Sequence, residues 1–117
     1  MNYQFTQKCI NNSAEEIWQF FVNGLSNDVT IKSIKEKLHY TVNYINKEEI
    51  SFSAATRNDG EPESIPHDDF IKVIQRLKNE SHFNTSSAKE LFKQTTIYKK
   101  RSPFFALLLS SGVIENT

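Results

Sequence analysis

Apolar residues near the N-terminus recur at the spacing of a helix face. Between residues 13 and 25, Ile17 and Phe21 fall on one side of a helix with the neighbouring apolar positions. The preceding SAEE sequence is a capping box: the Ser13 hydroxyl accepts a hydrogen bond from the Glu16 backbone N–H, and the Glu16 side chain accepts one from the Ser13 N–H. These features predict an amphipathic helix over residues 13–25.

The second half of the chain has the pattern of three helices, which we place at residues 66–78, 87–93 and 102–111. The first begins at Pro66, a residue suited to the first turn of a helix, and continues with an apolar stripe. The second begins at another capping box, Ser87 to Glu90. The third is apolar nearly all round and ends near Gly112, so we expect it to be buried or to provide a homodimer surface.

Between these helical regions the pattern changes to alternation. Residues 39–45 and 49–55 alternate apolar and polar side chains on either side of a polar turn, and they predict a β-hairpin over residues 39–55. An isolated hairpin is only marginally stable, so a third strand from residues 3–10 or 28–34, or a covering helix, must complete the layer. Residues 29–36 have mixed periodicity and fit either a short helix or a strand.

The order of these elements predicts an α+β fold. A small antiparallel sheet containing the hairpin is packed by the N-terminal helix and followed by the C-terminal helical cluster. The length of 117 residues fits a single domain spanning residues 1–117. Nine of the residues are Phe, so we expect a core built on phenylalanine.

Composition is that of an ordinary globular chain, 38% hydrophobic and 24% charged. The longest apolar run, residues 104–109, is far below the roughly 20 residues that a membrane span needs, and the N-terminal residues show no signal-peptide pattern. Cys9 is the single cysteine, which excludes an internal disulfide and fits a reducing environment. We therefore expect a cytoplasmic protein with no membrane partner.

The segment from Arg57 to Phe70 concentrates acidic and turn-forming residues. It holds five acidic residues and one basic residue, together with two of the three prolines and one of the three glycines. The alternating Asp59, Glu61 and Glu63 could share a face and bind a cation such as calcium, but the spacing of an EF-hand is absent. A tight turn at Asp59-Gly60 within a solvated connection is the favoured interpretation.

The sequence does not indicate a catalytic or metal site. The three histidines, His39, His67 and His82, lack the spacing of a zinc site. The HDD sequence that starts at His67 resembles a ligand cluster, but adjacent residues of a helix point about 100° apart. Cys9 has the pattern of a small core residue, and no glycine-rich phosphate loop is present. We predict no metal, no cofactor and no catalytic residue.

Basic residues concentrate towards the C-terminus. Residues 70–117 hold eight basic and three acidic residues, although the net charge of the chain is zero. The sequence YKKRS at residues 98–102 directly precedes a predicted helix, whose N-terminus favours phosphate. We predict a nucleic-acid backbone site formed by Arg57, Lys99, Lys100, Arg101 and Ser102. Two alternatives remain: a solvated charge run, and pairing of Arg57 with its acidic neighbours.

The segment from Ser87 to Glu115 consists of a capped short helix, a linker, an apolar helix and an extended end. With the helix before it, residues 66–115 in all, it is loosely similar to helix-turn-helix and winged-helix modules, which implies DNA binding. The apolar residues 104–109 offer no polar side chain to read bases, and the linker of about eight residues is long for the turn of the motif. Contact with DNA would therefore be made to phosphates, without reading the sequence.

For function, the sequence favours a small non-enzymatic binding or interaction module, acting as an oligomer or as an accessory to a larger complex. Nucleic acid is the specific ligand we expect. The main alternative is a small-molecule-binding protein or an enzyme, with a pocket between the hairpin and the helices lined by Phe, Tyr and Trp18. A third is an orphan protein of a mobile cassette, whose role no residue reveals.

Overall fold

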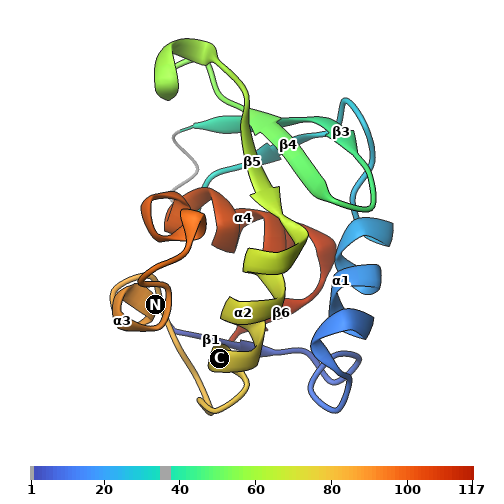
Figure 1. The fold of residues 1–117 in the computed structure, drawn as a ribbon, viewed down its shortest axis with the longest axis vertical. Helices are drawn as coiled ribbons and strands as arrows, with labels where there is room; N and C mark the ends of the chain where they lie inside the picture. Colours follow the sequence, from blue (N-terminus) through green and yellow to red (C-terminus); the bar gives the residue numbers. More distant parts are fainter. Residues whose placement is uncertain (1, 35–37) are drawn as a thin grey trace.

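Two antiparallel sheets and a group of helices make up the part of the chain that the computed structural model describes, residues 2–34 and 38–117. The larger sheet has the order β2 (Thr30–Lys32), β3 (His39–Ile45), β4 (Glu49–Ser53) and β5 (Glu63–Pro66), and the smaller pairs β1 (Tyr3–Phe5) with β6 (Ile114–Asn116). The helices are α1 (Ala14–Asn23), α2 (His67–Leu77), α3 (Ala88–Leu91) and α4 (Arg101–Ser111), with the 3₁₀ helices η1 (Asn58–Gly60) and η2 (Thr96–Lys100). The larger sheet lies above the helices in Figure 1. The predicted α+β class is confirmed.

The predicted hairpin is present as β3 and β4. Val42 lies opposite Phe52 and Ile45 opposite Ile50, and the Asn46 side chain accepts hydrogen bonds from two backbone N–H groups in the turn. The third strand is β2, from the 28–34 segment, whereas the N-terminal strand pairs with β6. The segment of mixed periodicity runs on to residue 36, and its last two positions lie outside the described residues.

The acidic segment forms a turn, a strand and the start of a helix. Asn58, Asp59 and Gly60 have φ values of 53°, 53° and 81°, the left-handed region that Asn, Asp and Gly tolerate best. This confirms the predicted turn at Asp59-Gly60. The strand β5 that follows pairs with β4, and the sequence analysis did not predict it. Its formation places the chain at the edge of the larger sheet before α2 begins.

The first two helices agree closely with their sequence signals. In α1 the capping box of Ser13 and Glu16 is formed, with Ile17, Trp18 and Phe21 buried. In α2 the N-cap is Pro66, and the apolar stripe predicted for this helix is buried. Both helices lie side by side below the larger sheet, and both pack through these apolar faces (Figure 1).

The third helix, α3, is shorter than the predicted 87–93, and the capping box predicted at Ser87 is not formed. Ser87 has helical dihedral angles (φ −68°, ψ −30°) because helical winding already starts at Asn84, whose carbonyl accepts from the Ala88 N–H at 2.9 Å. The Ser87 N–H donates to Asn84 Oδ1 at 2.7 Å, so Asn84 provides the cap. Glu90 instead pairs with Lys93 at 2.9 Å.

The last helix, α4, confirms its predicted position and lies at the centre of the molecule (Figure 1). Its neighbours are α1, β2, β6 and η2, and Gly112, at φ 82°, ends it. Of the two expectations for residues 102–111, burial is confirmed: most of the apolar side chains are buried within the chain, and Leu109 is partly buried.

Phenylalanine provides much of the core, as predicted from composition. Eight of the nine Phe residues are buried. Seven of these rings contact one another from α1 to the smaller sheet, and Phe52 of β4 packs against Tyr40. Phe104 of α4 contacts four other Phe rings, those of Phe21, Phe70, Phe92 and Phe105. In the described part of the chain, no helix combines the length and the apolar character that a membrane crossing requires.

Candidate functional site

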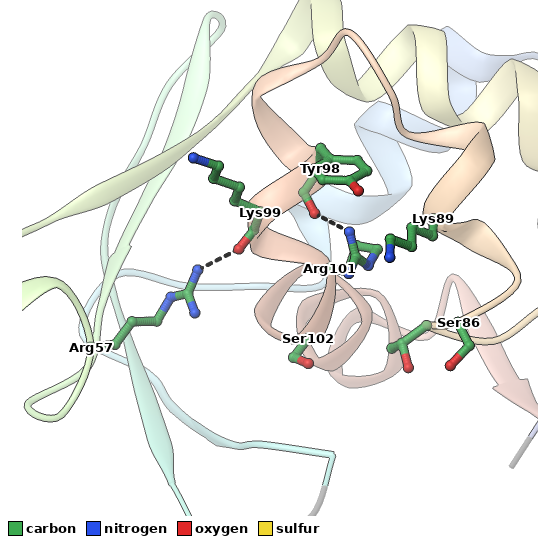
Figure 2. A pocket seen from close by; sticks show the side chains of 8 residues that line it. Arg57, Ser86, Lys89, Tyr98, Lys99, Arg101 and Ser102 are labelled. Atoms are coloured by element: carbon green, nitrogen blue, oxygen red, sulfur yellow. Dashed lines mark hydrogen bonds between the residues drawn. The ribbon is translucent and has the colours of Figure 1, made fainter.

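A cleft of about 420 Å³ lies at the N-terminal end of α4 and is surrounded by basic and hydroxyl side chains (Figure 2). It is lined by Arg57, Thr85, Ser86, Lys89, Tyr98, Lys99, Arg101 and Ser102. Four chain segments meet here: the turn after β4, the loop before α3 together with α3, the 3₁₀ helix η2, and the first turn of α4. We call this the basic cleft.

The turn after β4 fixes Arg57 at one wall of the basic cleft. Its Nε donates to Glu63 Oε2 at 2.7 Å, and its Nη2 donates to the Lys99 carbonyl at 2.9 Å. The left-handed turn at residues 58–60 reverses the chain and thereby returns Glu63 to Arg57. Arg57 therefore pairs with an acidic neighbour, as one alternative held, and it also lies in the lining of the basic cleft.

The wall next to Arg57 is formed by η2 and the start of α4. The Asp69 carboxylate of α2 accepts the Thr96 N–H at 3.0 Å and so holds the beginning of η2. At its other end, Arg101 Nη1 donates to the Tyr98 carbonyl at 2.6 Å, and the guanidinium lies 4.7 Å from the centroid of the Tyr98 ring. Arg101 and Tyr98 therefore hold each other in place.

Lys100 points away from the basic cleft. Its Nζ donates to the Ser64 carbonyl of β5 at 2.7 Å, and its side chain lines a separate hollow that also includes Tyr44 and Glu49. Burial of the ammonium group lowers the pKa of Lys100 from its usual value. Lys100 therefore joins η2 to the edge of the sheet.

The basic cleft carries an excess of positive charge. Among the described residues, Lys89, Lys99 and Arg101 make no ion pair, and no acidic side chain lines the cleft. Figure 2 shows Lys89 and Arg101 extending into the same space from α3 and α4. Ser102 lies in the first turn of α4, at the positive end of the helix dipole. These features together suit an anion with several oxygen acceptors, such as a phosphate group.

The structure brings four of the five predicted site residues to one cleft, namely Arg57, Lys99, Arg101 and Ser102. Lys100 is the exception. Three further lining residues were not predicted from the sequence, namely Thr85, Ser86 and Lys89. Lys89 was placed only as a position inside a capping box. The one available signal for Lys89 was the general excess of basic residues after residue 70.

The other candidates for chemistry occupy structural positions. Cys9 is buried, and burial raises the pKa of its thiol, so it is a poor nucleophile. Within residues 2–34 and 38–117, no three His, Cys, Asp or Glu side chains are grouped to hold a metal ion. Trp18 is buried against Phe21, Phe70 and His67. It therefore belongs to the packed core, which corrects the expectation that it lines a ligand pocket.

Comparisons of the chain with protein-family models, with curated proteins and with solved structures find no match. The geometry and charge of the basic cleft are therefore the features that bear on function. Lys89 and Arg101, which make no ion pair among the described residues, meet in the cleft with three hydroxyl-bearing side chains besides Tyr98 and with a helix N-terminus.

Proposed function

We propose that the protein is a binding module that holds the phosphate backbone of a nucleic acid in the basic cleft. The observation that supports this proposal is the convergence of Lys89 and Arg101 on one cleft that has no acidic lining side chain among the described residues, with Lys99 also in its lining. Phosphate contacts by lysine, arginine, hydroxyl groups and helix N-termini supply most of the affinity of proteins that bind nucleic acids without reading bases.

The arrangement of the cleft favours a phosphate site over a run of basic residues that is merely exposed to solvent. Arg57 is fixed by Glu63 and by the Lys99 carbonyl, and Arg101 by Tyr98, so the walls are held before any ligand arrives. Arginine offers five N–H donors in a planar fork, and Arg101 uses one of them on Tyr98. The other donors can therefore reach phosphate oxygens with little further loss of side-chain freedom.

Binding of a fluorescently labelled oligonucleotide, followed by anisotropy, tests this proposal. We expect Lys89→Ala combined with Lys99→Ala to weaken binding by about tenfold or more at low salt, and by a similar factor for every sequence, because phosphates carry no sequence information.

The matched control is Lys8→Ala combined with Lys47→Ala, because it removes the same two positive charges from exposed positions outside the basic cleft. We expect this variant to bind like the wild-type protein. Equal affinity of the variant at Lys89 and Lys99 and the wild-type protein would contradict the proposal, as would the absence of binding to any nucleic acid.

A further inference from the structure

A second hollow adjoins the basic cleft on the other side of Tyr98. Its volume is about 400 Å³, and its exposed lining is mostly apolar, in contrast to the basic cleft. It is lined by Lys93, Gln94, Thr95, Thr96, Tyr98 and Lys99. Tyr98 provides its one aromatic ring, and Lys93 is already paired with Glu90 at 2.9 Å. We call this the apolar hollow.

The two hollows are neighbours, because Tyr98 and Lys99 line both. One side is cationic and rich in donors, and the other is mostly apolar and contains an aromatic ring. A nucleotide unit has the same division, with an anionic phosphate beside a flat base that stacks on aromatic side chains. Two neighbouring hollows of these kinds thus correspond to neighbouring parts of one ligand.

Tyr98 is prepared for stacking by its own contacts. The Arg101 guanidinium lies over its ring at 4.7 Å and donates to its carbonyl at 2.6 Å, and the side chain is only half-buried. Tyr98 also packs partly against the hydrophobic core, and its exposed part lines the apolar hollow, where a base would stack. Since Arg101 also lines the basic cleft, a single Tyr98–Arg101 unit contacts both the base and the phosphate.

From these contacts we infer that the site selects single-stranded nucleic acid, with a phosphate in the basic cleft and an unpaired base stacked on Tyr98 in the apolar hollow. The inference rests on the proposed function. A base within a duplex is already stacked on its neighbours and cannot reach Tyr98 without leaving the helix. The duplex can offer only its phosphates, so it forms fewer contacts with the same site.

The test compares labelled single-stranded DNA, single-stranded RNA of the same sequence and the matching DNA duplex, again by anisotropy. For the wild-type protein we expect the better of the two single strands to bind about tenfold tighter than the duplex. Tyr98→Ala should remove most of this preference by weakening single-strand binding, with duplex affinity nearly unchanged. Tyr98→Phe keeps the ring and should keep the preference.

Photocrosslinking tests the same contact in the unmodified protein. A single strand containing 5-bromouracil should crosslink to Tyr98, as identified by mass spectrometry of the digested complex. Equal affinity for single strand and duplex, an equal effect of Tyr98→Ala on both, or crosslinks only at other residues would overturn the inference while leaving the phosphate proposal in place. If none of the three nucleic acids binds, the proposed function itself fails.

Discussion

Gly24 lies where the end of α1 meets the end of α4. A Cβ atom at this position would lie 2.5 Å from the Ser111 carbonyl oxygen and 2.9 Å from the Ser111 Cα. Both atoms belong to the backbone of α4, which lies in the core and cannot move aside cheaply. The φ of Gly24 is −84°, which any residue adopts, so the requirement for glycine is steric. We expect Gly24→Ala to lower the free energy of unfolding by about 1–3 kcal/mol, measured by urea denaturation.

Gly60 provides a matched control for this substitution. It has a φ of 81°, and nothing lies within 4 Å of the position that a Cβ would take. Asparagine tolerates the left-handed region, so Gly60→Asn should change stability by no more than about 0.5 kcal/mol. A Gly24→Ala variant as stable as the wild-type protein would contradict the close approach of the two helix ends.

Lys99 and Lys100 show that the sequence does not reveal the direction in which a side chain points. Their sequence context is nearly the same, and both were predicted to contact phosphate. In a 3₁₀ helix successive side chains point about 120° apart, so adjacent lysines diverge. Lys100 then reaches Ser64 of β5, a strand that the sequence analysis had not predicted. The basic character of the segment was predictable, whereas the direction of each side chain depends on tertiary contacts.

At the scale of elements, His67 joins the first turns of α1 and α2. Its Nδ1 lies 2.9 Å from Asp68 Oδ1 and its Nε2 lies 2.5 Å from Glu15 Oε2, and its ring packs edge-on against Trp18. Hydrogen bonds to Asp68 and then to Glu15 raise the pKa of His67 above its usual value. The protonated imidazole therefore bridges two carboxylates on two helices.

This arrangement predicts a pH-dependent stability. Because the pKa of His67 is higher in the folded protein than in the unfolded chain, protonation of His67 stabilises the fold. The stabilisation is complete below the pKa of histidine in the unfolded chain, about 6.5, and it is lost as the pH rises through the pKa in the folded protein. We therefore expect the free energy of unfolding of the wild-type protein to exceed that of His67→Gln by the largest amount below about pH 6.5. This difference should shrink as the pH rises. Denaturant unfolding at several pH values gives this difference.

An NMR titration of the His67 ring provides the control. Glu15→Gln removes one of the two carboxylates, so the pKa of His67 should fall towards its usual value while Asp68 remains. A pKa that Glu15→Gln leaves unchanged would show that the bridge between α1 and α2 does not form in solution.

Elements with strong local signals were predictable, and those defined by their neighbours were not. The capping box at Ser13 forms as predicted, but the same sequence pattern at Ser87 does not, because Asn84 starts the winding earlier. Likewise, the apolar side chains all round α4 predicted either burial or a partner surface. The helix is buried because four other elements pack around it, namely α1, β2, β6 and η2. Local propensity is overridden wherever neighbouring segments supply the caps and the contacts.

At the scale of the whole molecule, charge is separated although the net charge is zero. Acidic side chains of the 57–70 segment are engaged in internal contacts: Glu63 with Arg57, Asp68 with His67 and Asp69 with Thr96. The basic cleft, in contrast, contains cations without acidic partners among the described residues. Attraction of a nucleic acid would therefore come from the local field of this cleft, since the protein as a whole offers no net charge.

This separation predicts how binding depends on salt. If Lys89, Lys99 and Arg101 each neutralise one phosphate of a single strand, the logarithm of the association constant should fall with the logarithm of salt concentration with a slope of about −2. Lys89→Ala should reduce the steepness by about 0.7, because one fewer counterion is released. Lys100→Ala should leave the slope unchanged, since the Lys100 ammonium donates to the Ser64 carbonyl.

Anisotropy titrations at several salt concentrations measure these slopes. Equal effects of Lys89→Ala and Lys100→Ala on the slope would contradict binding in the basic cleft, because Lys100 lies outside it.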